Sequence, residues 1–162
     1  GASTGGFTEV LLLGGAEKVF AFDVGYGQMA SRLQNNSRVK LKDRFNVKNL
    51  SWEDLETKHG YLLIVMDLSF ISLLNIFPVI QKLKSESPNT KFEVVSLIKP
   101  QFECLPEQTE KGIVKDARIH LQVLRKITKF LRYEMKAEIK GICNSGIRGA
   151  SGNREFFIYW EI

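Results

Sequence analysis

Two charged side chains stand at the ends of apolar runs that have the composition of buried strands. Asp67 closes the run YLLIVMD, and Lys99 closes VVSLIK, where the following Pro100 prevents the strand from continuing. A carboxylate directly after a buried strand is costly to desolvate unless it has a partner or lies at the mouth of a site. Alone, Asp67 could cap the next helix and Lys99 could extend to solvent. On parallel neighbouring strands they would meet at one sheet edge, where each would influence the protonation of the other.

A glycine turn at the start of the sequence, GASTGGF from Gly1 to Phe7, indicates a backbone that comes close to a ligand. Such a turn normally follows a buried strand and opens a helix, whose N-terminus can approach a carboxylate or a phosphate. Asp23 ends the run VFAFD about 20 residues further on, where an acid typically accepts hydrogen bonds from the ribose hydroxyls of an adenosine cofactor. Asp23 could instead cap the segment GYGQ. The turn and the acid together favour a nucleotide-like cofactor.

The elements that must position these residues follow from apolar periodicity. Strands are expected at 19–24, 39–41, 61–67, 92–98, 137–142 and 156–162. Helices are expected at 7–13, 28–33, 73–83 and 117–131. This alternation predicts an α/β fold with a mostly parallel, doubly wound sheet. A polar, glycine-containing loop separates the last two strands, so we expect an antiparallel hairpin at one sheet edge.

Size and composition indicate one globular domain. With 162 residues and 44% apolar content, the chain can form one complete core. Its longest apolar stretch, residues 61–66, is far shorter than the roughly 18 to 20 residues that cross a bilayer. The formal net charge of +5 favours an anionic partner. Cys104 and Cys143 lack the spacing of a disulfide scaffold or a zinc site, which fits a reducing cytoplasm, and we expect no metal centre.

Five motifs in order along the chain, GASTGGFT, FDVGYGQ, MDLSFISL, LIKPQFE and GNREF, resemble the TlyA family of haemolysin-annotated, FtsJ-like ribose 2′-O-methyltransferases. The resemblance implies a Rossmann-like, S-adenosylmethionine-dependent methyltransferase fold. It also implies a Lys-Asp-Lys-Glu catalytic tetrad, whose last three members match Asp67, Lys99 and Glu155. The family places the first lysine before the glycine turn. We therefore expect residues 1–162 to be a methyltransferase domain that lacks its N-terminal strand and the small N-terminal RNA-binding domain of the family.

The resemblance extends to the cofactor site, where Asp43 and Asn46, just after the strand expected at 39–41, are weaker assignments than Asp23. The residues that it implies near S-adenosylmethionine are Gly1, Ala2, Ser3, Thr4, Gly5, Gly6, Phe7, Asp23, Asp43, Asn46, Asp67 and Leu68, with Ser69 adjoining them.

The chemistry implied by the resemblance agrees with these side chains. A methyl group on a sulfonium is already activated, so the enzyme needs chiefly to align a ribose 2′-hydroxyl with it and help that hydroxyl lose its proton. Lys99 takes the central role, and Asp67 and Glu155 are its electrostatic and hydrogen-bonding partners. Cys104 is interpreted as a plain thiol rather than a catalytic one.

Contacts to the expected substrate, ribosomal RNA or ribosomal subunits, are less sharply marked. Phosphate contacts would come from basic side chains. The candidates are Arg118, Arg125, Lys126, Lys129, Arg132, Arg148 and Arg154. On the helix, a solvated basic face is the favoured interpretation. The loop 103–115, which includes Lys111 and Gly112, could close over substrate.

Three alternatives accompany this cytoplasmic methyltransferase hypothesis. A nicotinamide-dependent oxidoreductase would use a glycine turn and an acid in the same way, but it would leave Asp67, Lys99 and Glu155 unexplained. A membrane-active haemolysin would need an apolar segment that the sequence does not offer. A catalytically inactive RNA-binding relative is the third alternative.

Overall fold

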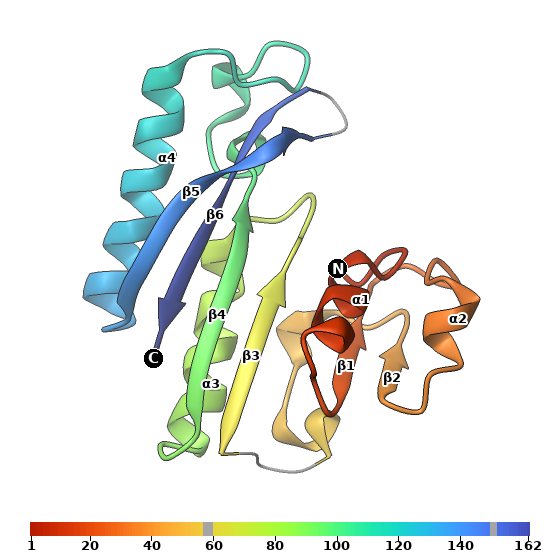
Figure 1. The fold of residues 1–162 in the computed structure, drawn as a ribbon. Coiled ribbons are helices and arrows are strands. Elements are labelled where there is room, and N and C mark those ends of the chain that lie inside the picture. Colours follow the sequence, from red (N-terminus) through yellow and green to blue (C-terminus); the bar gives the residue numbers. More distant parts are fainter. Residues whose placement is uncertain (57–59, 150–151) are drawn as a thin grey trace. The chain divides into compact units, whose positions relative to one another are not determined.

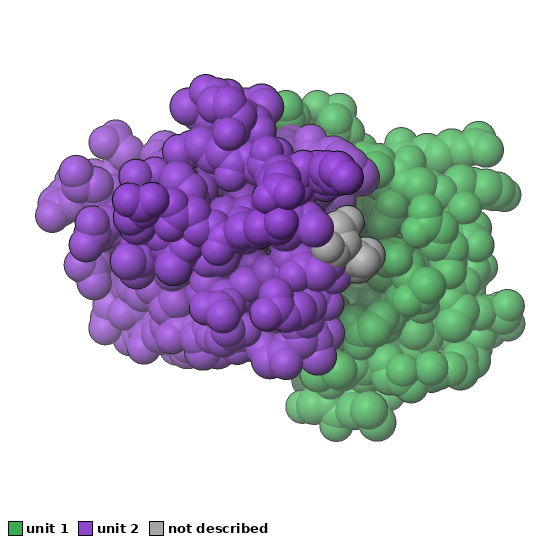
Figure 2. Space-filling view, turned by 90° about the horizontal axis from the view of Figure 1, so that it is seen from above, with its two compact units in different colours: residues 1–57 green, residues 58–162 purple. Residues whose placement is uncertain are grey.

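The computed structural model describes residues 1–56, 60–149 and 152–162 of the chain (Figure 1). The chain divides into two compact units, Gly1–Thr57 and Lys58–Ile162, which are coloured separately in Figure 2. Each unit is described by itself.

The first unit is a small α/β layer. In chain order it contains helix α1 (Gly6–Leu13), strand β1 (Val19–Phe22), helix α2 (Ser31–Gln34) and strand β2 (Val39–Lys42). Strands β1 and β2 are parallel, with Val19 opposite Val39. Short 3₁₀ helices follow at Val47–Asn49 and Trp52–Leu55.

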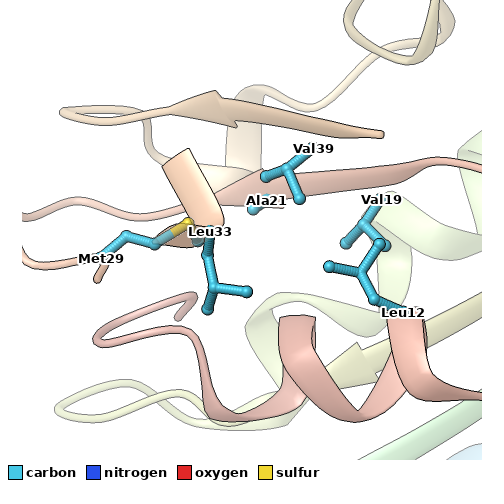
Figure 3. Close-up of a cluster of buried hydrophobic side chains, with 6 residues drawn as sticks. All are labelled: Leu12, Val19, Ala21, Met29, Leu33 and Val39. Atoms are coloured by element: carbon cyan, nitrogen blue, oxygen red, sulfur yellow. The ribbon is translucent and has the colours of Figure 1, made fainter. Parts of the chain in front are cut away.

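The core of this unit is formed by alternate side chains of β1 and the facing sides of the helices. Burial alternates along β1, which turns Val19 and Ala21 inward as expected for a strand with one covered face. The buried cluster in Figure 3 consists of Leu12, Val19, Ala21, Met29, Leu33 and Val39.

The second unit contains a four-stranded mixed sheet. Its strands are β3 (Tyr61–Met66), β4 (Lys91–Ile98), β5 (Glu138–Arg148) and β6 (Arg154–Glu161), in the spatial order β3-β4-β6-β5. Strands β3 and β4 are parallel, whereas β6 is antiparallel to both β4 and β5. The parallel core and the antiparallel hairpin at the edge confirm the expected fold class.

Two helices of this unit, α3 (Phe77–Glu86) and α4 (Ala117–Lys129), pack on the sheet (Figure 1). The ring of Phe77 on α3 lies 5.4 Å edge-on from that of Trp160 on β6 and 6.1 Å from that of Phe130, just after α4. Phe77 and Trp160 are fully buried. These contacts place both helices on the same face of the sheet.

Several element boundaries differ from expectation; for example, the helix expected at 28–33 is α2, Ser31–Gln34. The helix expected at 73–83 is a 3₁₀ turn, Leu73–Asn75, followed by α3, because Pro78 has no N–H to donate to an earlier carbonyl and therefore fits only the first turn of a helix. The helix expected at 117–131 changes after Lys129 into a π-helix, Phe130–Glu134. Strand β5 continues to Arg148, and its last residues are mostly exposed, so they carry little apolar periodicity.

Candidate active site and cofactor-binding turn

The central feature of the second unit is an ion pair between Asp67 and Lys99. Lys99 Nζ lies 2.6 Å from Asp67 Oδ1, and it donates a hydrogen bond to Ser69 Oγ at 3.0 Å. The Lys99 side chain is only 14% exposed, so it does not extend freely into solvent, and the Asp67 side chain is 39% exposed. The pair is therefore a partly buried charged group with one open side.

The parallel strands β3 and β4 bring these two residues together. Met66 pairs with Ser96, so Asp67 directly follows the last paired residue of β3 while β4 continues toward Lys99. Pro100 then begins a 3₁₀ turn, Pro100–Phe102, which ends the strand. The prediction that both charges occupy the same sheet edge agrees with this geometry.

Glu155 lies at the start of β6, next to β4. Ile98 pairs with Phe156 in antiparallel register, and extending that register by one residue places Glu155 opposite Lys99. Glu155 is 7% exposed, and its carboxylate lies so close to Gly149 that a Cβ there would clash with it. In the described part of the chain, Asp67 is the ion-pair partner of Lys99, and Glu155 is its cross-strand neighbour.

An exposed aromatic ring lies in the loop that follows Asp67. Phe70, three residues after Asp67, is 89% exposed and has a backbone φ of +61°, which is rare for a bulky residue. Its ring centroid lies 5.0 Å from that of Phe102. Strained backbone of this kind tends to occur where a site needs a side chain in a particular direction.

In the first unit, the glycine turn leads directly into α1. Gly5 has a φ of +101°, and a Cβ at this position would clash with Leu33, so packing and backbone both require glycine. Gly6 opens the helix, and a Cβ there would meet nothing within 4 Å. No side-chain hydrogen bond caps the helix N-terminus.

Asp23 joins the glycine turn to the end of β1. Its Oδ2 accepts a hydrogen bond from the Ser3 N–H at 2.8 Å, and its Oδ1 accepts one from the Gly25 N–H at 2.7 Å. Partial burial acts to raise the pKa of this carboxyl, but the backbone hydrogen bonds from Ser3 and Gly25 outweigh it and the pKa lies below its ordinary value. Asp23 is therefore held ionised, and it both caps GYGQ and holds the turn.

Asp43 and Asn46, the weaker candidates for the cofactor site, have local structural roles. Asp43 Oδ2 accepts a hydrogen bond from the Gly27 N–H at 2.7 Å. Asn46 caps the 3₁₀ helix Val47–Asn49 by accepting from the Lys48 N–H at 3.0 Å. Leu68 lies in the loop after β3, directly after Asp67. No binding role of these residues is tested by their geometry, and each stays a prediction.

The loop 103–115 is fixed at Asn153, a residue that the sequence reasoning missed. Asn153 is 1% exposed; its Oδ1 accepts from the Val114 N–H and its Nδ2 donates to Gly112 O, both at 2.9 Å. Lys111 and Gly112 both have positive φ, as a type I′ hairpin turn requires. The Lys-Gly pair was a visible turn signal, whereas the role of Asn153 was not.

Several of the basic candidates have partners within the chain. Arg118 pairs with Asp116 at 2.8 Å, and Lys126 Nζ donates to Glu103 O at 2.7 Å. Arg148 donates to Gly152 O at 2.9 Å. The remaining ones, Arg125, Lys129, Arg132 and Arg154, are exposed. Burial raises the pKa of the Cys104 thiol, which agrees with its interpretation as an unreactive thiol.

The fold is that of a methyltransferase. The model of the FtsJ-like methyltransferase family matches residues 1–161, and the chain belongs to this family. No helix in the described part of the chain has the length and apolar character needed to span a membrane.

Two curated proteins and one solved structure are similar to nearly the whole chain. The chain is 39% identical over 160 residues to the 16S/23S rRNA (cytidine-2′-O)-methyltransferase TlyA of Mycobacterium tuberculosis, covering 98% of this chain and 57% of that protein. It is 40% identical over 164 residues to hemolysin A of Brachyspira hyodysenteriae, covering 100% and 65%. A crystal structure of a hemolysin-named protein from Lactococcus lactis superposes with a TM-score of 0.88 at 35% identity, covering 99% and 74%. The expected resemblance to TlyA proteins is confirmed, and the chain spans between half and two thirds of the length of these two curated relatives.

Proposed function

We propose that the protein transfers a methyl group from S-adenosylmethionine to a ribose 2′-hydroxyl of ribosomal RNA, in the cytoplasm. The observation that carries this proposal is the ion pair of Lys99 and Asp67, 2.6 Å apart at the ends of two parallel strands. Ligands of open parallel sheets bind beyond the carboxyl ends of the strands, where this pair lies. Family membership favours methyl transfer over the nicotinamide alternative.

The residues of the first unit fit S-adenosylmethionine. The Asp23 carboxylate accepts backbone hydrogen bonds on both oxygens, and its remaining lone-pair capacity can serve a ribose hydroxyl of the cofactor. No side chain caps the start of α1, and Gly6 leaves open space there, so a carboxylate can approach the N-terminus of this helix. When bound, S-adenosylmethionine supplies a methyl group that its sulfonium has already activated.

The charged residues of the second unit orient the ribose hydroxyl. Asp67 and Ser69 hold the ammonium group of Lys99 in place. This group can donate a hydrogen bond to the 2′-oxygen as negative charge develops there. Glu155, opposite Lys99 in the β4–β6 register, adds a second carboxylate that can accept hydrogen bonds. Overall the 2′-oxygen takes the methyl group, which leaves the donor sulfur as a neutral thioether, and the hydroxyl proton passes to a carboxylate of this charged cluster.

The choice of RNA as substrate rests on the relatives and on the surface of the second unit. The M. tuberculosis relative is named for methylating cytidine in 16S and 23S rRNA. The exposed ring of Phe70 offers a stacking surface for a base, and exposed arginines such as Arg125 and Arg154 offer phosphate contacts.

The test measures transfer of radiolabelled methyl groups from S-adenosylmethionine to purified ribosomal subunits and to naked ribosomal RNA by the full-length protein. Digestion of the RNA to nucleosides should release the label as a 2′-O-methylated nucleoside. Label on a base instead would contradict the proposal. Binding of NAD, but not of S-adenosylmethionine, would support the oxidoreductase, and dye release from liposomes that rises with concentration of pure protein would support the haemolysin.

A further inference from the structure

Glu103 is a buried carboxylate at the end of the segment LIKPQFE that has no role in the chemistry described above. It is 5% exposed. Its Oε2 accepts a hydrogen bond from the Ser72 hydroxyl at 2.6 Å, and its Oε1 accepts one from the Leu73 N–H at 2.7 Å. Both partners lie about 30 residues earlier in the chain, so Glu103 joins two segments that are distant in sequence.

Those two segments are the loops that carry the ion pair. One loop runs from Asp67 to Ser72 after β3, and the other runs from Lys99 to Glu103 after β4. They are tied at one end by Lys99 and Asp67, 2.6 Å apart, and at the other end by Glu103 and Ser72. Between the two ties, the rings of Phe70 and Phe102 lie 5.0 Å apart.

Burying the carboxylate of Glu103 carries a desolvation penalty. Burial raises the pKa of Glu103, although the hydrogen bonds from Ser72 and Leu73 oppose that effect. Lys126 lies nearby on α4, and its ammonium donates to the backbone oxygen of Glu103 at 2.7 Å. An apolar side chain would fill the space without the desolvation cost, but it would leave the Leu73 N–H without an acceptor.

The loop held by Glu103 needs such support. Phe70 stands in it at a φ of +61°, and backbone strain of this kind persists only where the surroundings fix the conformation. Ser69, the neighbour of Phe70, is the hydroxyl that accepts from Lys99. A shift of this loop would therefore move both partners of Lys99, Asp67 and Ser69, together.

We propose that Glu103 is a positioning residue, which holds Asp67 and Ser69 against Lys99 by fixing the Ser72–Leu73 turn. This inference rests on the proposed methyl transfer for its kinetic test. Misplacement of reacting groups by about 1 Å can cost on the order of 100-fold in rate. Loss of the Glu103 side chain should therefore act on kcat.

The kinetic test compares Glu103→Ala with Glu103→Gln in the full-length protein. Glutamine can accept from the Leu73 N–H through its oxygen and donate to Ser72 Oγ through its nitrogen, so it preserves both ties. Glu103→Ala should lower kcat by roughly 10- to 100-fold with little change in KM for S-adenosylmethionine, and Glu103→Gln should restore most of kcat. Glu107→Gln, an exposed carboxylate of the same loop, is the control. Equal kcat values for Glu103→Ala and wild type would overturn the inference.

Amide hydrogen exchange tests whether Glu103 fixes the loop after β3, and it needs no methyl transfer. In Glu103→Ala the amides of residues 68–73 should exchange at least about tenfold faster than in wild type, while those of β4 and β6 remain protected. Faster exchange at Leu73 alone would overturn the inference, because the loop would then hold without Glu103. If the wild-type protein transfers no methyl group but the two proteins show this difference in exchange, the positioning role of Glu103 holds and the proposed function fails.

Discussion

Asn153 holds Val114 with a 2.9 Å hydrogen bond, and this contact attaches the loop 103–115 to the strand that carries Glu155. The second hydrogen bond of the Asn153 side chain, to Gly112 O, fixes the tip of the same loop. The loop is therefore anchored only two residues from the expected catalytic carboxylate. The buried Asn153 amide thus holds the loop in two places.

Asn153→Ala should lower the free energy of unfolding by about 2 kcal/mol, since it removes two buried hydrogen bonds and leaves the Val114 N–H without an acceptor. Urea denaturation measures the change. Asn89→Ala, at an exposed turn, is the matched control and should change the free energy by less than about 0.5 kcal/mol. If the two variants are equally stable, the loop is not anchored as described.

Asp23→Asn should weaken binding of S-adenosylmethionine by roughly 10- to 100-fold. The amide nitrogen of asparagine cannot accept from the Ser3 or Gly25 N–H, so the variant loses one of the hydrogen bonds that hold the turn. It also loses an acceptor for the ribose of the cofactor. Isothermal titration calorimetry measures the dissociation constant, and Glu17→Gln, at an exposed position, is the control. Unchanged affinity in Asp23→Asn would remove this carboxylate from the cofactor site.

His120 should make the stability depend on pH. It is 7% exposed, its ring lies 5.7 Å from that of Phe156, and Asp116 and Arg154 are the charged groups that influence it. Burial lowers the pKa of the folded imidazole below the unfolded value of about 6.5. The unfolded chain therefore takes up the proton first, so stability is complete above pH 6.5 and is lost as the pH falls through the folded pKa.

His120→Phe should remove this pH dependence, because phenylalanine does not titrate. Urea unfolding of both proteins at several pH values between about 7.5 and 5 measures it. The wild-type midpoint should fall relative to the variant below pH 6.5. Parallel curves would show that His120 titrates alike in the folded and unfolded chains.

Phe70→Ala should weaken RNA binding while leaving stability nearly unchanged. The ring is 89% exposed, so little apolar burial is lost, and alanine bears the positive φ no worse than phenylalanine. Loss of one stacked base is worth about 1 to 3 kcal/mol, which predicts a rise in KM for RNA of roughly 5-fold or more. An unchanged KM for RNA would show that the ring does not contact the substrate.

The sequence was sufficient for the features that follow from strand order and polarity. Asp67 and Lys99 could be placed together because each ends an apolar run and parallel strands end at one sheet edge. The antiparallel hairpin could be predicted because no helix separates its strands. Asp43 and Asn46 were expected near the cofactor, and the local hydrogen bonds that they make leave that role a prediction.

The supporting contacts could not be predicted, because their partners are backbone groups far away in the sequence. Glu103 accepts from the Leu73 N–H, and Asn153 binds the backbone of Gly112 and Val114. None of these three backbone groups has a sequence signature for such a bond. The break before α3 had a visible cause in Pro78, but the apolar periodicity continues through it and indicates one helix.

The most direct test of the account is to compare Lys99→Ala with wild type in the methylation of ribosomal RNA, with alkaline hydrolysis as the readout. A 2′-O-methyl group blocks cleavage at its own nucleotide, so wild-type protein should leave a gap in the hydrolysis ladder. Lys99→Ala should abolish the gap, with a loss of rate on the order of 100-fold or more, and still bind S-adenosylmethionine. The exposed Lys82→Ala should leave the gap intact. A gap that persists in Lys99→Ala at the wild-type rate would contradict the central role of the Asp67–Lys99 pair.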